Sequence, residues 1–217
     1  MPIFQLQHDN FDFPPVSLAE PDGLLAIGGD LRAERLLNAY CHGIFPWFSE
    51  KPILWWSPDP RFVLFPDELK ISKSMRQVLK KTPFTITVNK AFKDVIRHCK
   101  TSPRAGQDGT WITSEMERAY TELHQMGFAV SVEAWQDEVL VGGLYGIRMG
   151  GCFFGESMFA KVSNASKAAF ISFVQSDPQL KIIDCQVHTE HLESLGARFI
   201  SRDQFLSITR ENMDIFQ

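Results

Sequence analysis

Two carboxylates in this 217-residue sequence lie inside apolar runs typical of β-strands, Glu156 in FFGESMF and Asp184 in IIDCQVH. Burying a charged group costs free energy unless the group is paired or has a function. Either carboxylate alone could instead accept hydrogen bonds from backbone donors at a strand end or bulge. Gln186 is two residues from Asp184, and alternate residues of a strand project from the same face. If the two carboxylates lie on adjacent strands, we expect them to belong to a catalytic site.

Several common types of active site have no counterpart here. The sequence contains no GxSxG, GxxxxGK[ST] or HExxH motif, and no GxGxxG after a strand. This argues against a standard hydrolase, a P-loop NTPase, a zinc protease or a dinucleotide-binding dehydrogenase. His188 and His191 are three residues apart, but no third ligand pattern accompanies them. The four cysteines form no CxxC pair, so we expect free thiols and no metal site.

Positive charge is concentrated in one part of an otherwise acidic chain. Eleven basic and three acidic residues between 61 and 104 give that segment a net charge of +8, and the overall charge of -4 leaves -12 elsewhere. Lys73, Arg76 and Lys80 share one face of a predicted helix, with Lys81 beside them. Contacts between such residues and phosphates would supply salt-dependent affinity for nucleic acid, although a solvated helix face would show the same pattern.

Hydrophobic periodicity and turn residues predict an α+β or α/β fold around one mixed, mainly antiparallel sheet. A Pro- and Trp-rich, irregular segment over 45–61 suggests a junction near 59–62, between a small N-terminal domain (1–60) and a larger domain (61–217). No run of eighteen apolar residues and no signal peptide is evident, so we expect a cytoplasmic protein without membrane contact. Helices are predicted over 31–43, 71–83, 89–100, 114–125, 163–175 and 191–196, and strands over 83–89, 127–159, 181–188 and 197–201.

Eight short motifs, in this order along residues 23–196, resemble those of the leucyl/phenylalanyl-tRNA-protein transferase family: LLAIGGDL, FPWF, ILWWSPDPR, GTWIT, VGGLYG, GESMF, NASK and IDCQ. The resemblance implies a larger domain similar to the GCN5-type acyltransferases, and no metal or organic cofactor. It further implies transfer of leucine, phenylalanine and, less readily, methionine from tRNA to proteins that begin with Arg or Lys. In bacteria this transfer marks those proteins for degradation through the N-degron pathway.

The resemblance also assigns roles to residues that match the family's motifs. Asp184, Gln186 and Glu156 match catalytic positions. Trp47 and Trp111 match tryptophans placed around the terminal adenosine of tRNA, where an indole can stack on a base. Core packing is the alternative for apolar side chains. We expect an aminoacyl pocket formed by Leu144, Phe153, Met158, Phe173 and Cys185, and a tRNA-binding face formed by Lys73, Arg76, Lys80 and Lys81.

This reaction needs no enzyme nucleophile, because an aminoacyl ester is already activated. It needs a neutral amine, a proton acceptor and stabilisation of the developing oxyanion. An α-amino group with a pKa of about 7.7 to 8 is mostly protonated at pH 7, so a nearby carboxylate could hold the amine and accept its proton. Asp184 is the candidate acceptor, or alternatively an orienting group, and Glu156 could hold the substrate's own ammonium group.

Two other functions are compatible with parts of the sequence. Acetyl-CoA-dependent N-acetyltransferases bind pyrophosphate with a glycine-rich loop, but the corresponding stretch here, AKVSNASK, contains no glycine. A non-catalytic tRNA-binding module would explain the basic segment but not the carboxylates in apolar strands. The aminoacyltransferase is therefore the preferred hypothesis, and we expect a monomer whose partners are aminoacyl-tRNA and an acceptor protein.

Overall fold

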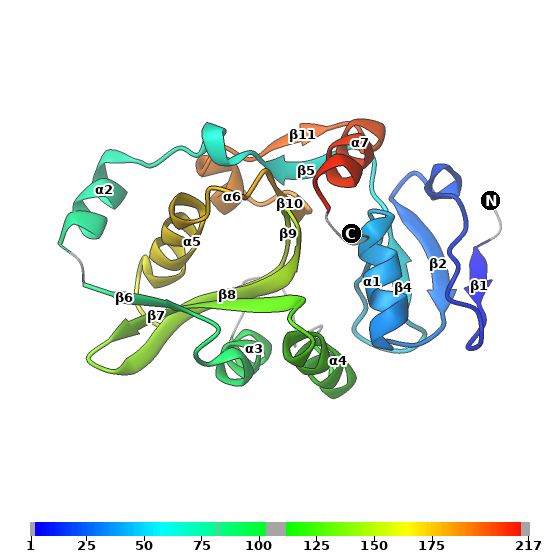
Figure 1. Cartoon of the computed structure of the whole chain (residues 1–217), viewed down its shortest axis with the longest axis horizontal. Coiled ribbons are helices and arrows are strands. Elements are labelled where there is room, and N and C mark those ends of the chain that lie inside the picture. Colours follow the sequence, from blue (N-terminus) through cyan, green and yellow to red (C-terminus); the bar gives the residue numbers. More distant parts are fainter. Residues whose placement is uncertain (1–2, 82, 103–111, 214–217) are drawn as a thin grey trace.

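Two β-sheets of unequal size form the fold (Figure 1). The computed structural model describes residues 3–81, 83–102 and 112–213. The smaller sheet contains β1 (Phe4–Leu6), β2 (Leu24–Gly28), β3 (Phe45–Pro46) and β4 (Leu54–Trp56). Its order is β1-β2-β4-β3, with a parallel pairing of β1 with β2 and two antiparallel pairings. Helix α1 (Ala33–Cys41) packs against this sheet through its buried face.

The larger sheet has seven strands. They are β5 (Arg61–Leu64), β6 (Thr85–Val88), β7 (Ala129–Gln136), β8 (Val139–Met149), β9 (Cys152–Ala160), β10 (Ile182–Gln186) and β11 (Arg198–Ile200). In the order β11-β5-β10-β9-β8-β7-β6, β9 and β10 pair in parallel and the other pairings are antiparallel. The predicted α+β class, with a mixed and mainly antiparallel sheet, is confirmed.

Three helices pack on the two faces of the larger sheet: α3 (Phe92–Thr101), α4 (Ser114–Gln125) and α5 (Ala165–Ser176). The other helices are α2 (Lys73–Lys80), α6 (Glu190–Ser194) and α7 (Arg202–Asn212), with short 3-10 helices at Val16–Leu18 and Pro66–Glu68. In Figure 1, α3 and α4 lie on one face and α5 on the other. α5 approaches β8 so closely that a Cβ at Gly142 would lie 2.6 Å from the Ala165 Cβ. None of these described helices is long and apolar enough to span a membrane.

The predicted helices and strands are confirmed, with their ends shifted by a few residues. The C-terminal helix α7 is a finding that the sequence pattern did not predict. Ser201 caps it by accepting a hydrogen bond from the Gln204 backbone at 3.2 Å, and Phe205 is fully buried. The irregular segment 45–61 contains only the short strands β3 and β4 and the first residue of β5. Strands of two and three residues are too short to show an alternating pattern of their own.

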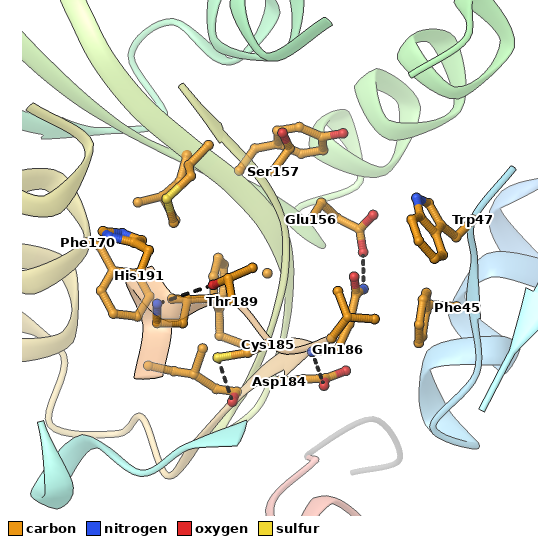
Figure 2. Close-up of a pocket in the computed structure, with 18 residues that line it drawn as sticks. Phe45, Trp47, Glu156, Ser157, Phe170, Asp184, Cys185, Gln186, Thr189 and His191 are labelled. Carbon is orange, nitrogen blue, oxygen red and sulfur yellow. Dashed lines mark hydrogen bonds between the residues drawn. The ribbon is translucent and has the colours of Figure 1, made fainter. Parts of the chain in front are cut away.

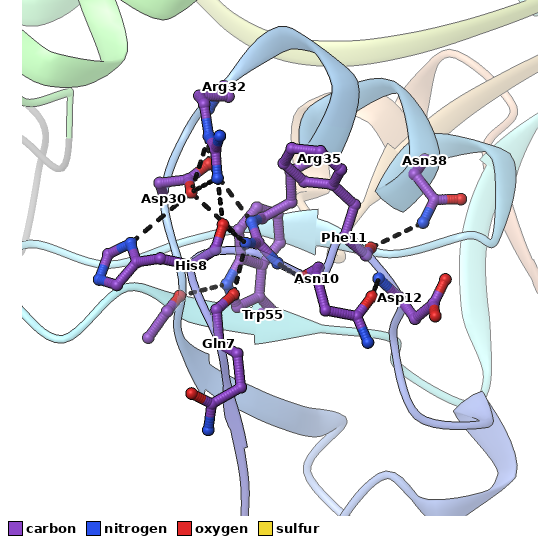
Figure 3. Close-up of polar contacts among 11 residues, drawn as sticks. Gln7, His8, Asn10, Phe11, Asp12, Asp30, Arg32, Arg35, Asn38 and Trp55 are labelled. Carbon is purple, nitrogen blue, oxygen red and sulfur yellow. Dashed lines mark hydrogen bonds and ion pairs between the residues drawn. The ribbon is translucent and has the colours of Figure 1, made fainter.

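Arg35 of α1 is buried and forms hydrogen bonds with the backbone of the N-terminal segment (Figure 3). The Arg35 side chain has no exposed surface, and it donates hydrogen bonds to the backbone oxygens of Gln7 at 2.7 Å and Asn10 at 3.0 Å. Asp30 accepts hydrogen bonds from both Arg32 and Arg35. Burial alone would raise the pKa of Asp30, but these hydrogen bonds outweigh it and hold the pKa well below its usual range. The carboxylate therefore stays charged and paired.

The two sheets share one hydrophobic core. Tyr40 of α1, Trp55 of β4 and Phe154 of β9 belong to the same buried cluster, as does Phe205 of α7. The predicted boundary between residues 1–60 and 61–217 falls between the end of β4 and the start of β5, although the division into two domains stays a prediction. The shared core matters for function because it brings β3 of the smaller sheet close to β9 and β10.

Candidate active site

A cavity of about 450 Å³ opens between β9, β10 and the start of α6 on one side and β3 on the other (Figure 2). Four of the five side chains predicted to form the aminoacyl pocket line it, and the fifth, Phe173, packs against the ring of Phe153 with centroids 4.8 Å apart. The wall is mainly apolar, which suits a hydrophobic side chain of a ligand. Binding of an aminoacyl group here stays a prediction. The four lining residues are Leu144, Phe153, Met158 and Cys185, and Phe170, Ile183 and Leu192 add further apolar surface.

Glu156 lies on the cavity wall and accepts hydrogen bonds from three side chains. The Tyr40 hydroxyl donates to Oε1 at 2.7 Å, the Tyr120 hydroxyl to Oε2 at 3.0 Å, and the Gln186 amide to Oε1 at 2.9 Å. Burial raises the pKa of Glu156 to about 7, against the opposing effect of these hydrogen bonds. A carboxyl group that titrates near neutral pH can exchange a proton with a substrate under ordinary conditions.

Asp184 forms a buried ion pair with Arg61, the first residue of β5. Arg61 Nε donates to Oδ1 at 2.8 Å and Nη2 donates to Oδ2 at 2.7 Å, and both residues are 1% exposed. The guanidinium carbon lies 4.6 Å from the ring centroid of Phe45 and 4.8 Å from that of Phe205. Because both carboxylate oxygens already accept charge-assisted hydrogen bonds, this geometry favours an orienting role for Asp184 over proton acceptance.

A β-bulge separates Asp184 from Gln186. The register of β10 against β5 shifts between these residues, which leaves Cys185 as the extra residue. Gln186 has a left-handed backbone with φ 62°, and its N–H donates to Asp184 Oδ1 at 2.9 Å. The regular alternation expected of a strand therefore does not hold here. The two carboxylates do lie on adjacent strands, β9 and β10, and the Gln186 side chain reaches Glu156.

Trp47 lies across the cavity from Glu156 (Figure 2). It is 38% exposed, and its indole packs edge-on against Trp56 with ring centroids 6.0 Å apart. Trp56 Nε1 donates to the backbone oxygen of Trp47 at 2.8 Å. An ordered aromatic ring that remains exposed at a cavity rim is suited to stacking on a base. Trp111, the second tryptophan predicted to contact adenosine, lies outside the described residues.

The predicted basic face is exposed on α2 and its C-terminal end. Met75, on the opposite side of this helix, is buried against the second hydrophobic cluster. The net charge of residues 61–104 overstates the local surface charge, because Arg61 is buried with Asp184 and Lys100 pairs with Glu117 at 3.0 Å. The four residues predicted to bind tRNA are all exposed: Lys73, Arg76, Lys80 and Lys81.

Sequence reasoning missed several residues of the site. The contacts from Tyr40 to Glu156 and from Arg61 to Asp184 join residues 116 and 123 positions apart, so no local pattern connects them. Arg61 does end the ILWWSPDPR motif, which was the available signal for its importance. The missed residues are Phe45, Tyr40, Arg61, Tyr120, Phe170 and Thr189, whereas His191 was considered only as a metal ligand.

The two histidines considered for metal binding have different environments. His188 Nε2 lies 3.0 Å from Glu193 Oε2, whereas His191 lines the cavity. Burial lowers the pKa of His191, so its imidazole is neutral at pH 7. Within the part of the chain that the structure describes, no group of three or more His, Cys, Asp or Glu side chains is placed to hold a metal ion.

Solved structures show only a weak likeness to this chain. A GCN5-related N-acetyltransferase from Kribbella flavida matches with a TM-score of 0.34 and 11% identity, over 80% of this chain and 62% of that one. L-PGS from Bacillus licheniformis matches with a TM-score of 0.42 and 15% identity, over 78% and 57%. Values this low carry no argument about function, and the fold class rests on the two sheets themselves.

Sequence relatives are far more similar. The family described as leucyl/phenylalanyl-tRNA protein transferase matches residues 63–210, and its N-terminal domain matches residues 29–59. A leucyl/phenylalanyl-tRNA–protein transferase of Flavobacterium johnsoniae is 62% identical over 96% of this chain and 99% of its own length. Another, of Syntrophus aciditrophicus, is 58% identical over 93% of this chain and 85% of its own length. The chain therefore belongs to the leucyl/phenylalanyl-tRNA protein transferase family, whose members are aminoacyltransferases.

Proposed function

We propose that this aminoacyltransferase moves leucine, phenylalanine and, less readily, methionine from aminoacyl-tRNA to the N-terminal α-amino group of proteins that begin with Arg or Lys. In the cytoplasm this transfer would mark the acceptor for degradation. The observation that carries the proposal is a mainly apolar cavity whose wall also presents a carboxyl group and an amide, Glu156 and Gln186. Such a cavity can hold an apolar side chain while polar groups contact the α-amino ester beside it.

The other site residues would bind the amino acid side chain and the tRNA. Met158 has a flexible thioether, which suits a pocket that accepts both a branched and an aromatic side chain. Trp47 and Trp111 would hold the terminal adenosine by stacking. The basic face of α2 would contact RNA phosphates, which positions the tRNA without reading its sequence. Both macromolecular substrates would then meet at the cavity.

The chemical step would depend on positioning and proton transfer. The ester carbonyl is already activated, so holding the acceptor amine beside it provides much of the rate enhancement. Gln186 would orient the amine or the ester, and its own backbone is held by Asp184, which Arg61 fixes in turn. We therefore assign Asp184 a positioning role and treat proton acceptance by Asp184 as the alternative.

Transfer of labelled phenylalanine from charged tRNA tests the proposed function. We expect label in a peptide that begins with Arg and little or none in the same peptide beginning with Ala, because the Ala peptide differs only in the N-terminal side chain. Leucyl-tRNA should behave similarly and methionyl-tRNA should react more slowly. If neither peptide is labelled and acetyl-CoA is consumed with the Arg peptide instead, the protein is an N-acetyltransferase and the proposal is wrong.

Charge removal on α2 should weaken tRNA binding and its salt dependence. Each phosphate contact contributes about 0.7 to 0.9 to the slope of log affinity against log salt, so changing Lys73, Arg76 and Lys80 to Gln should reduce that slope by about 2 to 3. Filter binding of charged tRNA at several salt concentrations measures it. The control changes three exposed basic residues elsewhere, Lys161, Lys181 and Arg210, to Gln. Equal slopes for the two triple variants would exclude α2 as the RNA-binding face.

A further inference from the structure

Three buried oxygen-bearing groups meet beside the cavity. The hydroxyl oxygens of Tyr40 and Tyr120 are 2.5 Å apart, and they lie 2.7 and 3.0 Å from Oε1 and Oε2 of Glu156. Both tyrosines are fully buried, and Glu156 is 8% exposed, where it contributes to the cavity wall. The three groups thus form a closed ring of three short contacts, with one member open to a ligand.

The number of hydrogens in this ring depends on the ionisation of Glu156. A phenol supplies one donor and can also accept, whereas an ionised carboxylate only accepts. With Glu156 ionised, only the two phenol hydrogens are available for the three contacts. In one contact the two oxygens therefore face each other with no hydrogen between them. With Glu156 protonated, the ring closes: Oε2–H donates to Tyr120, Tyr120 to Tyr40, and Tyr40 to Oε1. The ring can therefore take up one additional proton and gains a hydrogen-bonded contact when it does.

We infer that Glu156, held by Tyr40 and Tyr120 as positioning residues, accepts the proton that the incoming α-ammonium group must lose. This inference rests on the proposed function. The ammonium gives one proton to Glu156, and the resulting amine nitrogen bonds to the ester carbonyl carbon. The bond from that carbon to the ribose oxygen breaks, and the nitrogen's second proton goes to the departing oxygen. Glu156 then returns its proton to solvent.

The surroundings of Glu156 support this role over that of Asp184. Both oxygens of Asp184 are held by Arg61, and that guanidinium is itself buried. Burial raises the pKa of Glu156 to about 7, and the nearby charge of Asp184 adds to the increase. The titratable groups around Glu156 come from four elements besides β9. They are Tyr40 on α1, Tyr120 on α4, Tyr145 on β8, which packs edge-on against Tyr120, and Asp184 on β10.

The test measures single-turnover transfer of phenylalanine to an N-terminal Arg peptide as a function of pH. Tyr40→Phe and Tyr120→Phe each remove a donor that stabilises ionised Glu156, so the midpoint of the rate profile should move up by about one pH unit in each. Titration of the peptide's own amine is the same for every variant. Glu156→Gln should lower the rate about 100-fold at pH 7, whereas Asp184→Asn should lower the rate but keep the change in rate that follows the titration of Glu156.

Two further measurements make the result decisive. Thr87→Val is the matched control, because it also removes a hydroxyl that donates to a buried carboxylate, Glu133, on strands that do not line the cavity. Its midpoint should not move. Infrared titration of the protein without substrate should show a protonated carboxyl band that disappears near pH 7 and is absent from Glu156→Gln. This second readout reports on the ring even if no transfer is observed.

Several outcomes would overturn the inference. These are unchanged midpoints in both tyrosine variants, loss of the change in rate near pH 7 in Asp184→Asn with its retention in Glu156→Gln, and a carboxyl band that titrates below pH 5. Absence of transfer by the unaltered protein would refute the proposed function and this inference with it. Transfer by the unaltered protein together with any of the first three results would refute the inference alone.

Discussion

Replacing Arg61 with Met is expected to lower the free energy of unfolding by about 3 to 5 kcal/mol, because it leaves the carboxylate of Asp184 buried without its partner. Asp184 is 1% exposed, so solvent cannot take the place of the two lost hydrogen bonds. The guanidinium also contacts the rings of Phe45 and Phe205. The loss should therefore weaken the attachment of β3 and α7 to the larger sheet.

Urea unfolding compares this variant with two controls. Arg198→Met breaks a pair of the same two-bond geometry with Glu68, at 2.7 and 2.9 Å, but both partners are exposed. Exposed pairs contribute under about 1 kcal/mol, so this variant should remain close to the unaltered protein. Arg61→Met combined with Asp184→Leu should recover most of the loss, since an apolar pair can replace a buried ion pair. Equal losses for Arg61→Met and Arg198→Met would contradict the prediction.

Glu156→Gln should stabilise the folded chain at high pH while it lowers activity. The pKa of Glu156 is about 7 in the folded chain, against an ordinary value of 4.5. Below pH 4.5 the group is protonated in both states. As pH rises from 4.5 through 7, the unfolded chain releases this proton first, so the unaltered protein loses about 3 kcal/mol of stability. Glutamine resembles the protonated carboxyl group and has no such loss.

Unfolding at pH 4, 6 and 8 measures this difference directly. The stability of Glu156→Gln relative to the unaltered protein should rise by about 3 kcal/mol over the range, because pH effects from all other groups are common to both proteins. Glu68→Gln is a control whose relative stability should change with pH in the opposite direction. The hydrogen bonds from Arg198 lower the pKa of Glu68, so this variant should become relatively less stable as pH rises. A constant difference for Glu156→Gln would show that the group is not buried in its neutral form.

The helices were predictable because their determinants lie within each segment. The expected range 114–125 coincides with α4, where Thr113 accepts a hydrogen bond from the Met116 backbone at 3.1 Å and the apolar side chains recur at helical spacing. The spacing of Lys73, Arg76 and Lys80 likewise predicted one basic face on α2, and that face is exposed. β5 was not predicted, because it has only four residues and its partners in the sheet, β10 and β11, are distant in the chain. α7 was also not predicted, although Ser201 caps it locally.

The sequence by itself determined that Glu156 and Asp184 would be buried on strands, beside side chains able to form an apolar pocket. Only the tertiary structure decided what each carboxylate could do. Asp184 meets a guanidinium from β5, which engages both its oxygens, whereas Glu156 meets two neutral phenols from α1 and α4. The affinity of a buried carboxylate for a proton depends on solvent exclusion and on the charge of its partners. Here the guanidinium and the two phenols lie 36 to 123 residues away from the carboxylates in the chain.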